Sequence, residues 1–233
     1  MLLFLFFYVK MLLRIKSVGV FKMAKTLVAI GDSITKGTYT SDTDTGANSV
    51  AEKPFAAIVA ETLGYDFINC GMNGTSVSRT ARVFPEHAMS IRIETVEDAD
   101  ILLVAAGTND YGGCVELGSS EDREDISFYG GLDVFFRGIK AKNFEKVIVV
   151  TPIPRQDEEK NTKGYTLEDY RCAIEERTKE YGFSIIDGRG VPIDPSTAEG
   201  RRLHMRDGLH PNALGHRVYA EYVLERLREN KIV

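Results

Sequence analysis

The sequence has few cysteines, and they do not form a recognisable pattern. The three cysteines, Cys70, Cys114 and Cys172, are odd in number and far apart. This spacing fits neither a disulfide framework nor a paired Cys-x-x-Cys metal site. It is compatible with a reducing compartment, in which thiols stay free.

The chain also lacks clustered positive charge. Its formal net charge is -5 over 233 residues, and no stripe rich in Lys and Arg is present. Nucleic-acid binding relies on such clusters, because the phosphate backbone is negative. We therefore expect no nucleic-acid partner and a small molecule as the ligand. The residue pattern predicts no particular oligomeric state.

No apolar run is long enough to cross a membrane. The first nine residues, MLLFLFFYV, are apolar, but Lys10 ends the run and further basic residues follow. A membrane span needs about 20 apolar residues, so we expect no stable span. A signal peptide carries its positive charge before the apolar run, which is the reverse of this order. We therefore expect a cytoplasmic protein rather than a secreted one.

The apolar segment of residues 1–22 is interpreted as lying outside the mature protein. MAKTLVAIGDS, from Met23, opens directly into the first predicted strand. A membrane-associating N-terminal segment is the alternative interpretation. Residues 25–233 contain no linker, internal repeat or low-complexity tract, and their length suits one sizeable core. The sequence thus predicts a single domain over 25–233.

Five short apolar runs bounded by turn residues predict strands buried on both faces of a parallel sheet. These runs are Thr26–Ile30, Phe67–Asn69, Ile101–Ala105, Val147–Val150 and Ser184–Ile186.

Helical patterns lie between and after these strands. The expected helices are Pro54–Leu63, Leu132–Lys142, Leu167–Tyr181 with Thr166 as N-cap and Gly182 as C-cap, and Asn212–Glu229. The stretch from Tyr111 to Ser127 reads as a long loop. Alternating strands and helices predict an α/β fold, a three-layer α/β/α sandwich with a central parallel sheet of about five strands.

Ligands of such a fold bind beyond the carboxyl ends of the strands, and polar motifs follow three of the predicted strands there. Ser33 follows a strand-ending Gly-Asp, where a tight turn would expose its hydroxyl. Gly74 lies in NCGMNGTS and could present a backbone N–H, and Asn109 lies in AAGTND with a side-chain amide donor. Taken singly, each is more often an ordinary turn or helix cap.

Asp207 and His210 lie three residues apart in RDGLHPNALGH, before the last predicted helix. A serine hydroxyl is a weak nucleophile, so it needs a base, a group that orients the base, and donors for the developing oxyanion. His210 suits the base and Asp207 the orienting group. Taken alone, the segment fits a helix-capping aspartate and a surface histidine equally well.

The order of the four motifs favours the catalytic interpretation of these residues over the structural one. GDS, NxGxxG, GTND and DxxHP, each at the expected end of a strand or helix, resemble the SGNH (GDSL) hydrolase family from about Lys25 to the C-terminus. The resemblance implies a flavodoxin-like hydrolase fold and a catalytic triad of Ser33, Asp207 and His210. It also implies an oxyanion hole made by the Ser33 N–H, the Gly74 N–H and the Asn109 amide. Ile34 stands where the family often has leucine.

The second motif departs from the family pattern. Thr75 follows Gly74 where many relatives carry aspartate, so Gly71 is the alternative donor. Neither this change nor Ile34 removes a catalytic group. We expect no cofactor. We also expect no metal, because the spacing of His204, His210 and His216 does not supply the helical His-x-x-x-His pair of a zinc site.

The resemblance implies a carboxylic ester hydrolase that works through an acyl-enzyme. No apolar lid segment is apparent, so we expect small acyl groups, above all acetyl, borne by a carbohydrate. A lysophospholipase-like or thioesterase-like acylhydrolase is one alternative, and a non-catalytic glycan-binding module on the same fold is another. A nucleotide-binding protein is disfavoured, since no Gly-rich phosphate loop ending in Lys-Ser/Thr follows the first strand.

Overall fold

The computed structural model describes residues 24–41 and 48–233. The segment 1–22 lies outside these residues, so its interpretation stays a prediction. Within the described part of the chain, no helix combines the length and the apolar character needed to span a bilayer.

The expected central sheet is confirmed. Five strands pair in parallel in the order β4-β1-β5-β6-β7. They are β1 (Thr26–Gly31), β4 (Asp66–Gly71), β5 (Ile101–Ala105), β6 (Lys146–Val150) and β7 (Ser184–Ile186). All five predicted strands are present, and the observed ends lie within two residues of the predicted ones. β1 and β5 are buried almost throughout, as strands covered on both faces must be.

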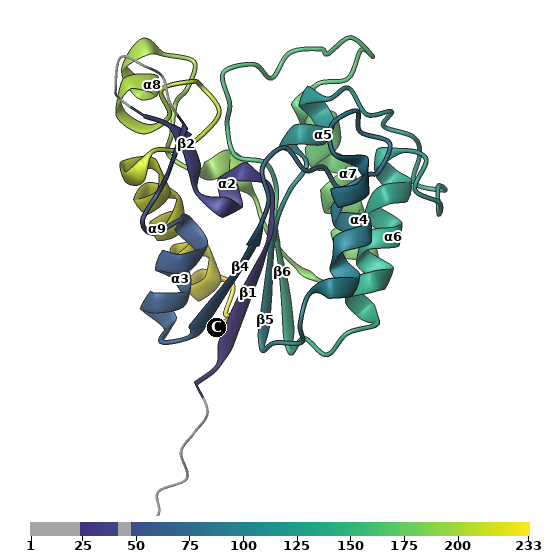
Figure 1. The fold of residues 1–233 in the computed structure, drawn as a ribbon, viewed down its shortest axis with the longest axis horizontal. Helices are drawn as coiled ribbons and strands as arrows, with labels where there is room; N and C mark the ends of the chain where they lie inside the picture. Colours follow the sequence, from purple (N-terminus) through teal and green to yellow (C-terminus); the bar gives the residue numbers. More distant parts are fainter. Residues whose placement is uncertain (1–23, 42–47) are drawn as a thin grey trace, which may run out of the picture.

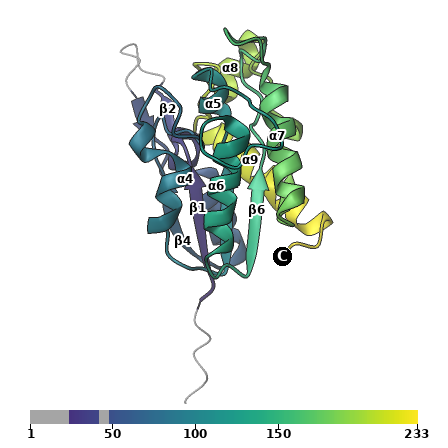
Figure 2. The ribbon, with the colours of Figure 1, turned by 90° about the vertical axis from the view of Figure 1, so that its right-hand side faces the viewer.

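Helices cover both faces of the sheet and make the three-layer sandwich (Figure 1). One face carries α3 (Phe55–Leu63) and α9 (Ala213–Glu229). The other carries α4 (Met89–Arg92), α6 (Phe128–Lys140) and α7 (Leu167–Glu180). Figure 2 shows α4 and α6 in front of the sheet and α9 behind it.

Local signals place the helix ends. Thr166 and Asp169 form a reciprocal capping box at the start of α7, and Asn212 caps α9 by accepting from the Gly215 N–H. Gly64 ends α3 at a φ of 72°, a left-handed conformation that suits glycine. The predicted caps Thr166 and Gly182 are close to correct: Tyr181 is the C-cap of α7, and Gly182 follows it with a φ of 67°.

The predicted start of α6 at Leu132 was wrong. The helix begins at Phe128, and Ser127 caps it by accepting from the Gly130 N–H. The sequence pattern did not predict this first turn, because it contains Gly130 and Gly131 and glycine disfavours helices. Gly131 is required by packing, since a Cβ there would lie 2.7 Å from the Ser78 Cβ.

The predicted loop from Tyr111 to Ser127 also needs correction at its start, because Tyr111 and Gly112 belong to a short helix. The sequence patterns missed several short elements. These are α2 (Ser33–Lys36), the hairpin of β2 (Thr38–Thr40) and β3 (Asn48–Val50), α4, α5 (Thr108–Gly112), α8 (Ala198–His204), and the 3-10 turns η1 (Pro85–His87), η2 (Ile93–Thr95) and η3 (Gly188–Gly190).

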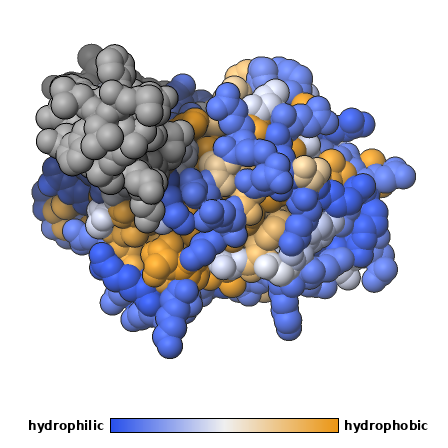
Figure 3. Space-filling view, turned by 90° about the horizontal axis from the view of Figure 1, so that it is seen from below, coloured by the Kyte–Doolittle hydropathy of each residue, from blue (hydrophilic) through white to orange (hydrophobic). Residues whose placement is uncertain are grey.

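Several of these short elements lie at the carboxyl ends of the strands, where Figure 1 shows α2, α5, β2 and α8. The opposite end of the molecule, seen from below in Figure 3, exposes apolar side chains among hydrophilic ones. A pocket of about 410 Å³ opens near the amino end of β6, between Lys140, Lys146 and Lys231. It lies at the other end of the strands from Ser33.

Gly31 is a position where a side chain has no room. A Cβ there would overlap the Thr35 hydroxyl and the main-chain oxygen of Ala105. We predict that Gly31→Ala lowers the free energy of unfolding by about 1–3 kcal/mol, because the end of β1 must move away from β5. Urea titration followed by circular dichroism measures this change.

Gly112→Ala is the control for Gly31→Ala. The nearest atom to its added Cβ is the Arg155 Nη1, at 3.4 Å, and alanine favours a helix more than glycine does. Equal midpoints for the wild type and Gly31→Ala would show that the end of β1 tolerates a side chain.

Candidate active site

Ser33 is presented by a tight turn at the end of β1. Asp32 caps α2, and its carboxylate accepts from the Ile34 N–H at 2.8 Å. Ser33 is the first residue of this four-residue helix, which Gly37 closes at a φ of 93°. The side chain therefore points away from the strand, although Ser33 is only 6% exposed.

Ser33, His210 and Asp207 form a continuous chain of hydrogen bonds. The Ser33 Oγ lies 2.8 Å from the His210 Nε2, and the His210 Nδ1 lies 2.8 Å from the Asp207 Oδ2. An ionised Asp207 can only accept, so Nδ1 carries the proton. Nε2 is then the acceptor for the Ser33 hydroxyl, which is the tautomer that a general base needs.

Asp207 is held as an anion by four donors. Its Oδ1 accepts from the N–H groups of Leu209 and His210, and its Oδ2 accepts from the His210 ring and from the Thr40 hydroxyl at 2.8 Å. Burial alone would raise the pKa of Asp207, but these hydrogen bonds outweigh it and lower the pKa below its ordinary value. Thr40, from the hairpin that the sequence patterns missed, has no sequence signal of its own.

Two backbone N–H groups at the site have no acceptor among the described residues. They belong to Ser33 and to Gly74, which adopts a φ of 72°. The N–H of Gly71, the alternative donor, instead bonds to the Asn69 side chain at 2.9 Å. Gly74 is therefore the better placed of the two glycines to donate to a ligand.

Asn109 lies in the first turn of α5, at the end of β5. Its Nδ2 donates to the main-chain oxygen of Thr75 at 2.9 Å. An amide nitrogen has two hydrogens, so this bond orients the side chain and leaves a second N–H. β4, β1 and β5 are adjacent strands, so the turns that bear Gly74, Ser33 and Asn109 are neighbours.

Asp110 joins the Gly74 turn to α5. This fully buried carboxylate accepts from the N–H groups of Val77 and Ser78 at 2.9–3.1 Å. Burial raises the pKa of Asp110 to about 7, although these hydrogen bonds oppose the shift. The residue next to Asn109 thus sets the distance between the two segments that carry the expected oxyanion donors.

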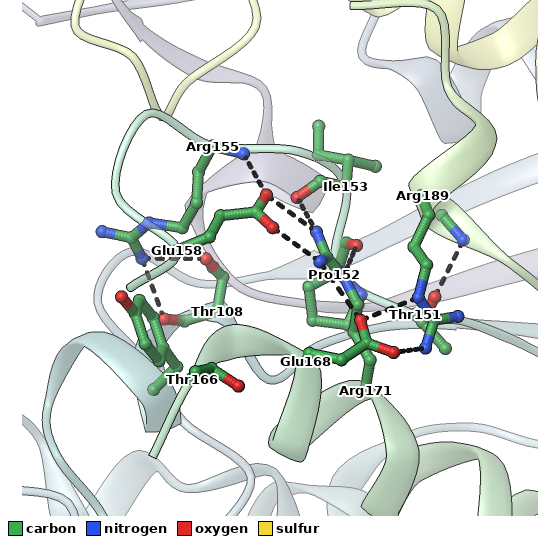
Figure 4. Close-up of polar contacts among 12 residues, drawn as sticks. Thr108, Thr151, Pro152, Ile153, Arg155, Glu158, Thr166, Glu168, Arg171 and Arg189 are labelled. Carbon is green, nitrogen blue, oxygen red and sulfur yellow. Dashed lines mark hydrogen bonds and ion pairs between the residues drawn. The ribbon is translucent and has the colours of Figure 1, made fainter. Parts of the chain in front are cut away.

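The loop after β6 also holds α5 in place through hydrogen bonds (Figure 4). The Arg155 Nη1 donates to both the main-chain oxygen and the hydroxyl of Thr108, each at 3.1 Å. Glu158 accepts from the Arg155 N–H at 2.9 Å and forms an ion pair with the buried Arg171 at 2.7 Å. Arg155 is thereby fixed beside Asn109, with its guanidinium over the Tyr111 ring.

An open pocket of about 820 Å³ adjoins the histidine loop. Its lining comes from the β6–α7 loop and the segment before α8, and it mixes polar residues such as Gln156 and Ser196 with apolar ones such as Pro154, Ile193 and Pro195. The Gln156 N–H donates to the main-chain oxygen of Gly208 at 2.7 Å. Gly208 lies between Asp207 and His210, so the pocket begins at the side of the site where His210 stands.

The histidines do not assemble into a metal site. His216 is buried in the core, where its Nδ1 accepts from the Phe55 N–H at 3.3 Å. Over residues 24–41 and 48–233, no cluster of three or more His, Cys, Asp or Glu side chains is arranged to hold a metal ion.

Buried carboxyl groups beside Ser33 predict a distinctive dependence of stability on pH. Burial raises the pKa of Asp32 to about 6 and that of Asp110 to about 7. In this window the folded protein keeps protons that the unfolded chain releases, so the free energy of unfolding falls as pH rises from about 4 to about 7. Asp207 acts oppositely, and its contribution is lost as pH falls below about 4. Burial lowers the pKa of His216 to about 4, so this group opposes the fall up to about pH 6.5 but does not outweigh the two aspartates together.

Urea titrations at half-unit intervals of pH test this prediction on the wild type and on Asp110→Asn. The variant should show a shallower fall between pH 4 and 7, by a few kcal/mol at most, since each unit of pKa shift corresponds to about 1.4 kcal/mol. Parallel curves for the two proteins would mean that Asp110 is ionised throughout this range.

The sequence and the fold are similar to those of known proteins. The sequence profile of the GDSL-like lipase/acylhydrolase family matches residues 29–218. No match among curated proteins reaches significance. Among solved structures, a protein from Lactobacillus plantarum is 26% identical with a TM-score of 0.74, and the match covers 88% of this chain and 97% of that one.

Two further solved structures share the fold at lower identity. An acetyl xylan esterase from Geobacillus stearothermophilus is 20% identical with a TM-score of 0.60, covering 88% of this chain and 94% of that one. A lipase/acylhydrolase from Enterococcus faecalis is 19% identical with a TM-score of 0.58, covering 88% and 96%. The family profile spans most of the chain, and the chain therefore belongs to the GDSL-like lipase/acylhydrolase family of ester-bond hydrolases.

Proposed function

We propose that this hydrolase is a serine esterase that removes small acyl groups, above all acetyl, from carbohydrate hydroxyls. The observation that carries the proposal is the chain of 2.8 Å hydrogen bonds from Ser33 through His210 to Asp207. Such a chain activates a hydroxyl for attack on a carbonyl carbon.

In the first half of the reaction, the Ser33 Oγ bonds to the ester carbonyl carbon and passes its proton to the His210 Nε2. The carbonyl oxygen becomes an oxyanion, which the N–H groups of Ser33 and Gly74 and the Asn109 amide stabilise. His210 then protonates the departing alkoxide, and the C–O bond to it breaks. Asp207 keeps the imidazolium oriented and balances its charge.

In the second half, water attacks the acyl-enzyme. His210 accepts a proton from that water, and the same donors stabilise the oxyanion of the second tetrahedral intermediate. The bond between the acyl carbon and the Ser33 Oγ then breaks, and His210 returns the proton to Ser33. The products are the free acid and the free enzyme. No group beyond the named residues and water is needed to balance these steps.

The surroundings of His210 support a polar alcohol. Because His210 protonates the leaving group, the alcohol half of the ester must lie on its side of Ser33. The open pocket that begins at Gln156 lies on that side, and its lining offers polar side chains such as Gln156, Thr166 and Ser196 beside apolar ones. The fold shared with the acetyl xylan esterase of Geobacillus stearothermophilus agrees with a carbohydrate as the alcohol.

Hydrolysis of p-nitrophenyl esters of increasing chain length tests the reaction. Removing the nucleophile in Ser33→Ala should lower kcat by about three orders of magnitude or more, whereas Ser184→Ala in β7 should keep the wild-type rate. The wild type should hydrolyse acetate esters faster than long-chain esters and should release acetate from acetylated xylan.

Each other outcome points to a different function. Equal turnover of short and long chains would favour a lysophospholipase-like or thioesterase-like acylhydrolase. An inert wild type that still binds acetylated xylan would favour a non-catalytic glycan-binding module. A Ser33→Ala variant that keeps its rate would exclude Ser33 as the nucleophile.

Asp110→Asn tests the positioning of the oxyanion donors. The substitution turns an amide NH₂ toward the N–H groups of Val77 or Ser78, so the Gly74 turn should shift relative to Asn109. We predict that kcat falls about 10-fold to 100-fold while KM changes less than about threefold, because oxyanion donors act mainly in the transition state. Steady-state kinetics measures both constants.

Asp98→Asn is the matched control, because Asp98 pairs with Asn143 in the loops at the amino ends of β5 and β6. A rise in KM alone in Asp110→Asn, with kcat unchanged, would contradict a role in holding the oxyanion donors.

A further inference from the structure

Two apolar side chains are exposed beside the proposed oxyanion hole. Val83 and Phe84 are 51% and 50% exposed, just before η1. Phe84 also adopts a φ of 50° and a ψ of 51°, the left-handed conformation. This conformation is rare for a bulky residue and costs on the order of 1 kcal/mol or more, so neither burial nor local backbone preference explains the position of the ring.

Both side chains lie against Gly74. A Cβ placed on Gly74 would be 3.2 Å from the Phe84 ring and 3.5 Å from the Val83 Cγ1. The Gly74 N–H has no acceptor among the described residues and is the proposed oxyanion donor. The apolar pair therefore begins within van der Waals reach of the residue that would hold the carbonyl oxygen of the ester.

The pair lies across Ser33 from His210. His210 belongs to the loop between α8 and α9, and α9 covers one face of the sheet. Val83 and Phe84 lead into α4, which covers the opposite face (Figure 1). Because His210 protonates the leaving alkoxide, the alcohol half of the ester points toward His210 and the acyl half points away from it.

We propose that Val83 and Phe84 form the wall of the acyl subsite and bind the aliphatic chain of the acyl group. This inference rests on the proposed function and extends it from acetyl to short aliphatic acyl groups, of which butanoyl is the test case. The two side chains are half open to solvent, so they cover the first few carbons of a chain and offer no enclosed tunnel for a long one. The apolar wall faces the acyl group, and the pocket near Gln156 faces the alcohol.

The first experiment compares kcat/KM for p-nitrophenyl butanoate and acetate. Removing the ring in Phe84→Ala should lower the butanoate-to-acetate ratio about fivefold to tenfold, since butanoyl has two more methylenes than acetyl and the half-open wall buries them only in part. Phe84→Leu should restore most of the ratio. Ile126→Ala, which removes a 67% exposed apolar side chain in the loop before α6, should leave the ratio unchanged.

Two results would overturn the proposal. An unchanged ratio in Phe84→Ala would show that the acyl chain does not touch the ring. An equal loss for acetate and butanoate would show that Phe84 only supports Gly74 and does not select the chain.

The second experiment needs no turnover. The sequence contains no tryptophan, so Ser33→Ala combined with Phe84→Trp places a single indole in the wall. Butyl butanoate should shift its emission to shorter wavelength and ethyl acetate should shift it less, whereas Ile126→Trp in the same background should respond to neither. No shift with butyl butanoate would overturn the acyl subsite, even if the wild type is an esterase. A shift combined with a wild type that hydrolyses no ester would support the subsite and overturn the esterase proposal.

Discussion

The parallel register of β4, β1 and β5 is the constraint on which the site depends. Gly31 pairs with Gly71 on one side and with Ala105 on the other, so the three strands end at the same level. Each is followed at once by a turn that bears one of the proposed oxyanion donors. A slip of one residue in either pairing would move one donor by about 3.3 Å, which is more than a hydrogen bond tolerates.

Strand register alone leaves the turns free to move, and buried polar groups hold them. Asp110 ties the segment after β4 to α5 through two backbone N–H groups. Arg155 ties the loop after β6 to the same helix through Thr108. A buried carboxylate and a half-buried guanidinium are costly unless they are hydrogen-bonded, and the hydrogen bonds that offset this cost also hold in place the turns that bear the proposed donors.

The parts of the structure that the sequence predicts are those set by local patterns. β5 was predicted from Ile101 to Ala105 because its apolar run is bounded by turn residues, and α7 was predicted because Thr166 and Gly182 are candidate caps at its two ends. Ser33, Gly74, Asn109, Asp207 and His210 could be proposed together because four motifs occur in the family order.

The remaining features depend on contacts between distant segments. Thr40 donates a hydrogen bond to Asp207, which is 167 positions away in the chain. No periodicity in the sequence predicts such a contact. The first turn of α6 was missed because Gly131 is there to approach Ser78, and packing overrides the low helix propensity of glycine. Phe84 reads as an ordinary apolar residue until its backbone conformation and its contact with Gly74 are seen.

The placement of α4 and α9 on opposite faces of the sheet has a consequence for how specificity is encoded. The proposed acyl subsite is formed by the connection between β4 and α4, and the proposed alcohol subsite by the β6–α7 loop and the segment before α8. The two halves of an ester would thus be recognised by separate stretches of chain that meet only at Ser33. Substitutions in one stretch could change the acid released without altering the alcohol accepted, so selection could act on each half independently.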